Sequence, residues 1–298
     1  MRRCLFASLV FLTRVLSPLG LRKSRTLNRL YHYLKLLTKS KKAVIDGHHL
    51  VLDKFDSLHL SVRTNYEAFE RELIAGEVKP GDTVLDIGGN IGLYTLHFAR
   101  LVGPEGKVHS FEPDPENFSL LQQNVEANGY ANVTLENKAV SENNGKLRLF
   151  RSPMNLGDHR IFDSGDDRES IEIESIALDE YFAERVPTIR FIKMDIQGSE
   201  CLALAGMKKL IGHQEKLHLM VEFWPYGLVR AGRSGEELLS LLLGHGFDLA
   251  TVDERRKEVT PVRDTEELLA AYPSDEEVFT NLFCTKVGPA CRAGPGRA

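Results

Sequence analysis

The run Val84-Leu-Asp-Ile-Gly-Gly-Asn-Ile-Gly-Leu-Tyr94 decides the fold of this chain. Its first four residues form a short, mostly apolar stretch that is typical of a buried strand in a parallel sheet. The glycine turn Gly88–Gly92 follows at once, and the apolar residues behind it recur at helical spacing. A strand, a glycine turn and a helix in direct succession are the opening unit of a doubly wound α/β sheet.

The chain beyond this run repeats the alternation of strands and helices. Lys107–Phe111 is predicted as the second strand, because Pro113 and Pro115 end it and favour a helix start at Glu116. Further strands are predicted at Asn132–Glu136, Ile189–Asp195, Leu217–Phe223, Phe247–Val252 and Phe279–Lys286, and further helices at Ser199–Leu210 and Gly235–Leu243. Residues 141–178 alternate polar and apolar positions around a polar loop, which predicts a β-rich insert. The expected fold is a doubly wound, mostly parallel, Rossmann-like α/β sheet.

The sequence divides into four parts. Residues 1–42 are predicted as a basic helical N-terminal arm, 43–77 as a lead-in hairpin and helix, 78–286 as the main domain, and 287–298 as a disordered tail. Apolar residues make up 42% and charged residues 27% of the 298 positions, which excludes a disordered, collagen-like or multi-span membrane protein. The four cysteines include no CxxC pair, so neither a disulfide framework nor a cysteine-rich zinc module is expected.

Charge is distributed unevenly along the chain. Of the 38 basic residues, 11 fall within 1–42 and 27 in the remainder, which also holds all 42 acidic residues. An apolar stretch near the start ends at Arg14, after too few residues to span a bilayer. The following segment has the pattern of a basic amphipathic helix, which suits packing on the main domain or peripheral contact with an anionic membrane. The acidic remainder argues against nucleic acid as a partner, and we expect a cytoplasmic protein, with the inner membrane surface as the candidate contact.

The ligand of a doubly wound sheet binds at the carboxyl ends of its strands. Glu112 lies at such an end, where an acid accepts both hydroxyls of a ribose, although it is also placed to begin a helix. Asp195 ends a later core strand, where it is either a reacting carboxylate or a helix N-terminal one. Lys193 points to the same face as Asp195, so an ion pair between them is expected to be inert. The chain has no GxxxxGK[ST] motif, which disfavours phosphoryl transfer from ATP.

Six blocks together carry a resemblance to a known family. The run at 84–94 resembles the first motif of class I S-adenosylmethionine-dependent methyltransferases, and the chain resembles the FkbM family over about residues 78–285. The matching blocks are Asp86-Ile-Gly-Gly-Asn-Ile-Gly92, Phe111-Glu-Pro-Asp-Pro115, Asn137-Lys-Ala-Val-Ser141, Ile192-Lys-Met-Asp-Ile-Gln-Gly-Ser-Glu200, Glu222-Phe-Trp-Pro225 and Asn281-Leu-Phe283. The resemblance implies an O-methyltransferase that uses S-adenosyl-L-methionine on a hydroxyl of a carbohydrate, glycolipid or natural product.

The resemblance also implies roles for individual residues. The cofactor-binding residues expected from it are Asp86, Gly88, Gly89, Asn90 and Gly92 at the methionine part, Glu112 at the ribose, Asp114 or Asn117 near the adenosine, and Ala139 at the adenine. Asp195 is the first candidate for the base that takes the hydroxyl proton, and His159 is the second unless it is an exposed loop residue. Glu200 and Glu222 are the residues that would join Asp195 around a divalent cation, but their spacing does not establish a metal site, and none is assigned.

Two other functions stay open at this point. The first is a nicotinamide-dependent oxidoreductase on a similar sheet, which the glycine spacing disfavours because it lacks the GxGxxG pattern. The second is a non-catalytic scaffold that keeps the fold and is recruited to membranes by residues 1–42.

Overall fold

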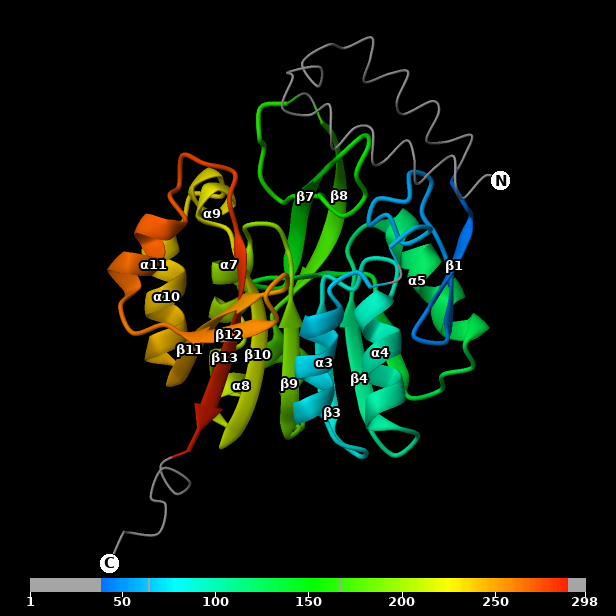
Figure 1. The fold of residues 1–298 in the computed structure, drawn as a ribbon, viewed down its shortest axis with the longest axis horizontal. Helices are drawn as coiled ribbons and strands as arrows, with labels where there is room; N and C mark the ends of the chain where they lie inside the picture. The colour runs from blue at the N-terminus through cyan, green and yellow to red at the C-terminus, as the bar shows by residue number, and fades with distance from the viewer. Residues whose placement is uncertain (1–38, 64, 167, 289–298) are drawn as a thin grey trace, which may run out of the picture.

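A computed structural model describes residues 39–63, 65–166 and 168–288 (Figure 1). Most of the predicted basic arm, and the tail from 289, therefore lie outside the described residues. Within the described ranges, no helix combines the length and the apolar character that a membrane crossing requires.

An eight-stranded sheet forms the centre of the molecule. Its strands, in spatial order, are β12 (Glu258–Pro261), β11 (Phe247–Asp253), β13 (Thr280–Val287), β10 (Lys216–Phe223), β9 (Ile189–Met194), β3 (Thr83–Ile87), β4 (Lys107–Phe111) and β5 (Val133–Glu136). The five from β10 to β5 pair in parallel, and β13 runs antiparallel to both of its neighbours. The chain adds β4 and β5 on one side of β3 and later returns to add β9 on the other. The predicted doubly wound, mostly parallel sheet is confirmed, and its switch point lies at β3.

Alternate residues of the central strands pack against two layers of helices. Val84 lies in an apolar cluster with Phe98 of α4 (Leu93–Val102), whereas Leu85 lies in a cluster with Leu204 of α7 (Glu200–Ala205). Helix α3 (Ala68–Glu77) joins α4 on the first face, and α8 (Lys208–Gly212) and α10 (Gly235–Gly244) join α7 on the second (Figure 1). Because both faces are buried, these strands are almost continuously apolar.

Two smaller β structures flank the sheet. The lead-in contains a hairpin of β1 (Lys42–Ile45) and β2 (His48–Val51), and it packs on α5 (Pro115–Ala127). The predicted insert is a three-stranded sheet of β6 (Ala139–Val140), β8 (Glu169–Ile176) and β7 (Gly145–Arg151). Figure 1 shows β7 and β8 rising beyond the carboxyl ends of the parallel strands. The insert therefore lies at the end of the sheet where a ligand is expected.

The prediction of a single helix over Ser199–Leu210 is wrong, because this stretch forms two helices, α7 and α8. At Gly206 an added Cβ would lie 2.0 Å from the carbonyl oxygen of Ser141, so the chain passes too close to the insert to continue straight. The Asp179 carboxylate then accepts hydrogen bonds from the amides of Lys209 and Leu210, at 3.0 and 2.8 Å, and so caps α8.

Several short elements were not predicted. They are β12, α6 (Leu178–Tyr181), α9 (Pro225–Arg230) and α11 (Thr265–Ala271). Two boundaries also differ by one residue, since Lys42 belongs to β1 rather than to the arm, and Val287 belongs to β13 rather than to the tail.

Candidate active site

The glycine turn after β3 holds three strands together. Gly88 has φ +88°, and a Cβ there would lie 2.1 Å from the backbone oxygen of Asp195 at the end of β9. The amides of Gly88 and Gly89 both donate to the carbonyl oxygen of Phe111, at 2.9 and 3.0 Å. The amide of Gly92 donates to Gly89 at 2.8 Å. The fold thus uses these three amides itself, and the turn offers a ligand close backbone approach rather than amide donors.

Gly88→Ala is expected to destabilise the fold severely. The left-handed backbone costs a residue with a Cβ about 1–2 kcal/mol, and overpacking against the Asp195 carbonyl adds about 1–3 kcal/mol. Thermal unfolding followed by circular dichroism should show a drop in Tm of several degrees or more. Gly76→Ala in α3 is the matched control, because a Cβ there has no neighbour within 4 Å and alanine is the better helix former. An unchanged Tm in Gly88→Ala would contradict this account of the turn.

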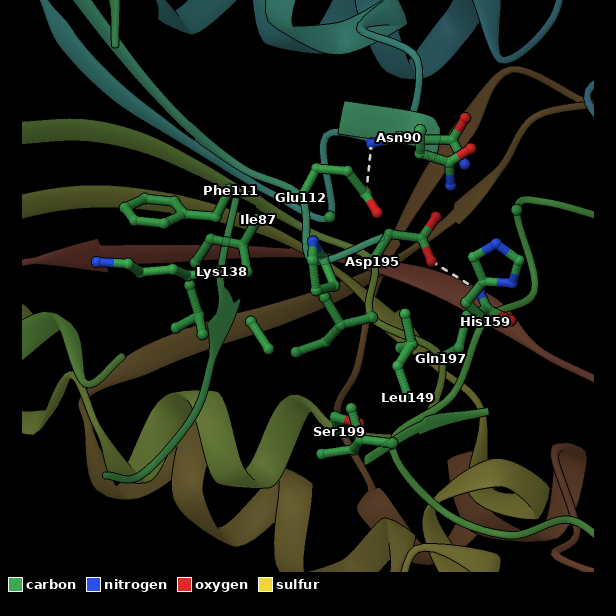
Figure 2. Close-up of a pocket in the computed structure, with 18 of the residues that line it drawn as sticks. Ile87, Asn90, Phe111, Glu112, Lys138, Leu149, His159, Asp195, Gln197 and Ser199 are labelled. Atoms are coloured by element: carbon green, nitrogen blue, oxygen red, sulfur yellow. Dashed lines mark hydrogen bonds between the residues drawn. The ribbon is translucent and has the colours of Figure 1, made fainter. Parts of the chain in front are cut away.

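Glu112 lies directly after β4 at the rim of a cavity (Figure 2). Its carboxylate accepts hydrogen bonds from the amide of Asn90, at 2.8 Å to Oε2, and from the amide of Asp114, at 2.9 Å to Oε1. Burial raises the pKa of Glu112 to about 8, although these two backbone hydrogen bonds act in the opposite direction. Each carboxylate oxygen has two lone pairs, so acceptor capacity for a ligand hydroxyl remains beside the two amides and the Asn117 side chain, which also hydrogen-bonds to Glu112.

The cavity beside Glu112 is walled mainly by apolar side chains from the sheet and the insert. They are Ile87, Phe111, Ala139, Val140, Leu149, Leu156, Ile161 and Ile196. Ala139, the residue predicted at the adenine, is among them and is buried. An apolar slot with one carboxylate at its rim fits a nucleoside, because the base needs an apolar surface and the ribose needs hydrogen-bond acceptors.

The loop of the insert covers this cavity. The carbonyl oxygen of Leu156 accepts hydrogen bonds from Asn90 Nδ2 at 3.2 Å and from Asn117 Nδ2 at 2.8 Å. The amide of Leu156 donates to Ser57 Oγ at 2.8 Å. Asn117 therefore fixes the loop over the cavity that it also lines.

Asp114 and His159 have structural partners. Asp114 Oδ1 caps α5 by accepting from the amides of Glu116 and Asn117, both at 3.0 Å, and Oδ2 lies 2.8 Å from Arg151 Nε. His159 is buried rather than exposed, and its Nδ1 accepts from the amide of Ser152 at 3.0 Å. Its Nε2 lies 3.8 Å from Asp114 Oδ2, and burial lowers the pKa of the imidazole. Because its acceptor nitrogen is occupied, this geometry does not support His159 as a base, nor Asp114 as a cofactor ligand.

A second, more polar cavity continues from the first. The two share Gly88, Asn90, Gly157, Asp195 and Gln197. The Asp195 side chain is 38% exposed at this junction, with Oδ1 accepting from Gln197 Nε2 at 2.8 Å and Oδ2 lying 3.5 Å from Lys193 Nζ. Figure 2 shows Asp195 across the cavity from Glu112. The junction is thus the place where a group carried by a nucleoside ligand meets a second molecule.

Asp86 forms part of the floor of this second cavity. It is buried on β3 and accepts a hydrogen bond from Thr95 Oγ1 of α4. Burial raises its pKa to about 6, while the Thr95 hydroxyl acts to lower it.

An acidic cluster around Lys193 lines the second cavity and was largely missed by the sequence reasoning. Tyr94 donates its hydroxyl to Glu67 Oε2 at 2.8 Å, and Gln197 Nε2 lies 3.1 Å from Glu222 Oε2. Burial first, and neighbouring carboxylates second, raise the pKa of Glu67 to about 7 and that of Glu222 well above its ordinary value. Glu222 ends a core strand and could be found from that position, whereas nothing in the sequence marks Glu67.

The possible metal site at Asp195, Glu200 and Glu222 is not assembled. Glu200 Oε1 instead accepts from the amides of Ile196 and Gly198, at 3.3 and 3.2 Å, and so holds the turn before α7. Across the described part of the chain, no group of three or more histidine, cysteine, aspartate or glutamate residues is placed to hold a metal ion.

The sheet order, the antiparallel β13 and an apolar cavity with a carboxylate at its rim at the switch point are the arrangement expected of a class I S-adenosylmethionine-dependent methyltransferase. The sequence agrees, because residues 86–249 match the Methyltransferase FkbM domain. The chain belongs to the FkbM methyltransferase family, and its cofactor is S-adenosyl-L-methionine. This membership places it among methyltransferases rather than among nicotinamide-dependent oxidoreductases.

Three relatives illustrate the range of the family. The chain is 30% identical to the 31-O-demethyl-FK506 methyltransferase FkbM of Streptomyces tacrolimicus, over 57% of this chain and 74% of that protein. It is 25% identical to Methyltransferase 1 of Beauveria bassiana, over 43% of this chain and 59% of that protein. It is 28% identical to the hexuronic acid methyltransferase AglP of Haloferax volcanii, over 45% of this chain and 54% of that protein. The chain thus spans little more than half of the length of the latter two.

Proposed function

We propose that this protein is an O-methyltransferase that acts on a hydroxyl of a carbohydrate, glycolipid or natural product. The observation that carries the proposal is the junction at Asp195, where an apolar cavity with Glu112 at its rim opens into a polar one whose lining holds more carboxylates than cations. Relatives named for an FK506-type and a hexuronic acid substrate support an oxygen acceptor. The carboxylates of the second cavity disfavour a nucleic acid, whose phosphates they would repel.

The described residues fit the cofactor. Glu112 has acceptor oxygens for the ribose hydroxyls, and Ala139 and Leu149, which pack in one apolar cluster of the insert, line the cavity that would hold the adenine. Asp86 and Asn90 lie towards the second cavity, where the methionine part would extend. When bound, S-adenosylmethionine supplies an electrophilic methyl group at this junction.

The chain's own contribution is to position the acceptor and to receive its proton. Asp195 is the exposed carboxylate at the junction, and Gln197 fixes its orientation through Oδ1. As the acceptor oxygen forms its bond to the methyl carbon, the carbon–sulfur bond breaks with its electron pair remaining on sulfur, and the hydroxyl proton passes to Asp195. The loop at Leu156 covers the nucleoside cavity and keeps water out of it.

Calorimetric titration with S-adenosylmethionine and S-adenosylhomocysteine tests the first half of the proposal. We expect micromolar binding of both by the full chain. Transfer of a labelled methyl group to a panel of methyl hexosides, glycolipids and macrolide alcohols tests the second half. An absence of binding at millimolar ligand would instead favour the non-catalytic scaffold. Binding without transfer to any oxygen acceptor would reject the proposed substrate class.

A further inference from the structure

Lys193 is a buried cation whose ammonium donates no hydrogen bond to any described residue. It lies on β9 and lines the second cavity, two residues before Asp195. Its Nζ is 3.5 Å from Asp195 Oδ2, an ion pair without hydrogen-bond geometry, and 5.1 Å from the centroid of the Tyr94 ring. The ion pair was predicted to be inert, but an ammonium has three N–H donors, and here they belong to a residue that lines a cavity.

The surroundings keep Lys193 charged. Burial alone would lower the pKa of this ammonium, but the charges of Asp195, Glu70, Glu67 and Glu222 raise it above its ordinary value. A permanently protonated lysine cannot serve as the base, so it can act on the reaction only as a donor and a positive charge.

The same carboxylates decide which oxygen the ammonium can meet. At the junction itself, Asp195 as the proposed base carries the negative charge that would repel a ligand carboxylate or phosphate. A neutral hydroxyl meets no such repulsion, and its oxygen becomes negative only as the reaction proceeds. We propose that Lys193 is a catalytic residue, whose ammonium donates a hydrogen bond to the acceptor hydroxyl at the junction. This inference rests on the proposed function, and it specifies that the acceptor is uncharged at the reacting position.

Asp195 and Lys193 then have different roles in the reaction. The hydroxyl proton moves to Asp195, and the Lys193 ammonium stabilises the negative charge that develops on the oxygen as the bond to the methyl carbon forms. Removing one such preorganised donor typically lowers kcat by about 10²–10³-fold. The acceptor is therefore a neutral alcohol at the reacting position, with no acid group beside the hydroxyl.

The first test needs no acceptor and compares two variants. Lys193→Met combined with Glu70→Gln removes one charge of each sign, so the cluster keeps its balance. Glu70→Gln alone is the matched control, because Glu70 is held by Tyr94 and Asn281 and does not line the cavity. S-adenosylmethionine carries a positive sulfur at the reacting position, whereas S-adenosylhomocysteine does not.

Calorimetry should show that the double variant prefers the sulfonium ligand more strongly than the wild type does. We expect the ratio of the two Kd values to shift by roughly fivefold or more, because a like charge near the sulfur is gone. Glu70→Gln alone should shift it less than twofold. An unchanged ratio in the double variant would place Lys193 away from the reacting atoms and overturn the inference. Failure of the wild type to bind either ligand would contradict the proposed function rather than the role of Lys193.

The second test uses turnover on methyl α-glucopyranoside, its 2-amino-2-deoxy analogue and its uronic acid counterpart. The neutral glycoside should be methylated, and the uronic acid should react at least 100-fold more slowly. The double variant should lose about 10²–10³-fold in kcat, and its KM for the cofactor should not rise. A preference for the uronic acid would contradict the neutral acceptor and overturn the inference. A parallel loss of Tm and of cofactor affinity in the double variant would show that Lys193 has a structural role only.

Discussion

Replacing Glu112 with glutamine is expected to weaken S-adenosylmethionine binding by about 100-fold or more. The amides of Asn90 and Asp114 already donate to the two oxygens of this side chain. A glutamine has one acceptor oxygen, so its NH₂ group would face one of these amides and lose the ribose hydroxyl on that side. Hydrogen bonds to a charged group contribute about 1.5–3 kcal/mol each and neutral ones about 0.5–1.5 kcal/mol. One charged bond is lost and the other becomes neutral, which together correspond to roughly 10²-fold or more in Kd.

Calorimetric titration with S-adenosylhomocysteine measures this loss without turnover. Glu116→Gln is the matched control, because Glu116 lies four residues after Glu112, in the first turn of α5, where its half-exposed carboxylate pairs with Arg151. The control should bind within about threefold of the wild type. If Glu112→Gln also stayed within threefold, Glu112 would be a helix-start and turn residue only, which is the alternative that the sequence left open.

The pH dependence of cofactor binding distinguishes the Glu112 carboxylate from the side-chain amide of the Glu112→Gln variant. The pKa of Glu112 is raised to about 8, first by burial, so a large fraction is protonated at neutral pH before the cofactor binds. Only the ionised form accepts from both ribose hydroxyls. Affinity should therefore rise between pH 6 and pH 9 in the wild type, and this rise should be absent in Glu112→Gln.

The parts of the fold that are set by local sequence were predictable. The strand at 83–87, its glycine turn and the following helix are coded within about twenty residues, and each boundary lies within one residue of the prediction. The break between α7 and α8 was not predictable, because it is caused by two distant contacts. Gly206 meets the backbone of Ser141, and Asp179 caps the second helix from another part of the chain.

The candidate site likewise contains some residues that the sequence could identify and others that it could not. Residues at the carboxyl ends of the strands, such as Glu112 and Asp195, could be named because topology places all such ends together. Glu67 could not, since it reaches the cavity from the start of α3, in a lead-in that carries no motif. Asp114 shows what the sequence does not reveal, because its carboxylate also caps a helix and pairs with Arg151, a residue of the distant strand β7.

Asp195→Asn is expected to lower kcat by about 10²–10⁴-fold, the usual contribution of a general base. Cofactor affinity should stay within about threefold, because the Asp195 side chain is 38% exposed and its contacts are to Gln197 and Lys193 rather than to the nucleoside walls. Single-turnover methyl transfer and calorimetry on the same preparation separate the two quantities. Glu277→Gln is the matched control, since it changes an exposed carboxylate at the rim of the same cavity and should leave both quantities unchanged.

The contrary result would identify a different base in the same cavity. Glu222 is joined to Asp195 through Gln197, whose Nε2 lies 2.8 Å from Asp195 Oδ1 and 3.1 Å from Glu222 Oε2. If Asp195→Asn kept full activity while Glu222→Gln lost it, the proton would leave through Glu222, and Asp195 would only orient Gln197. A base with a raised pKa gives the pH–rate profile a later rise. The profile of Asp195→Asn therefore decides between the two carboxylates. An active variant with a late rise identifies Glu222, whose pKa burial raises well above its ordinary value, whereas a loss of activity across the whole pH range identifies Asp195 as the base.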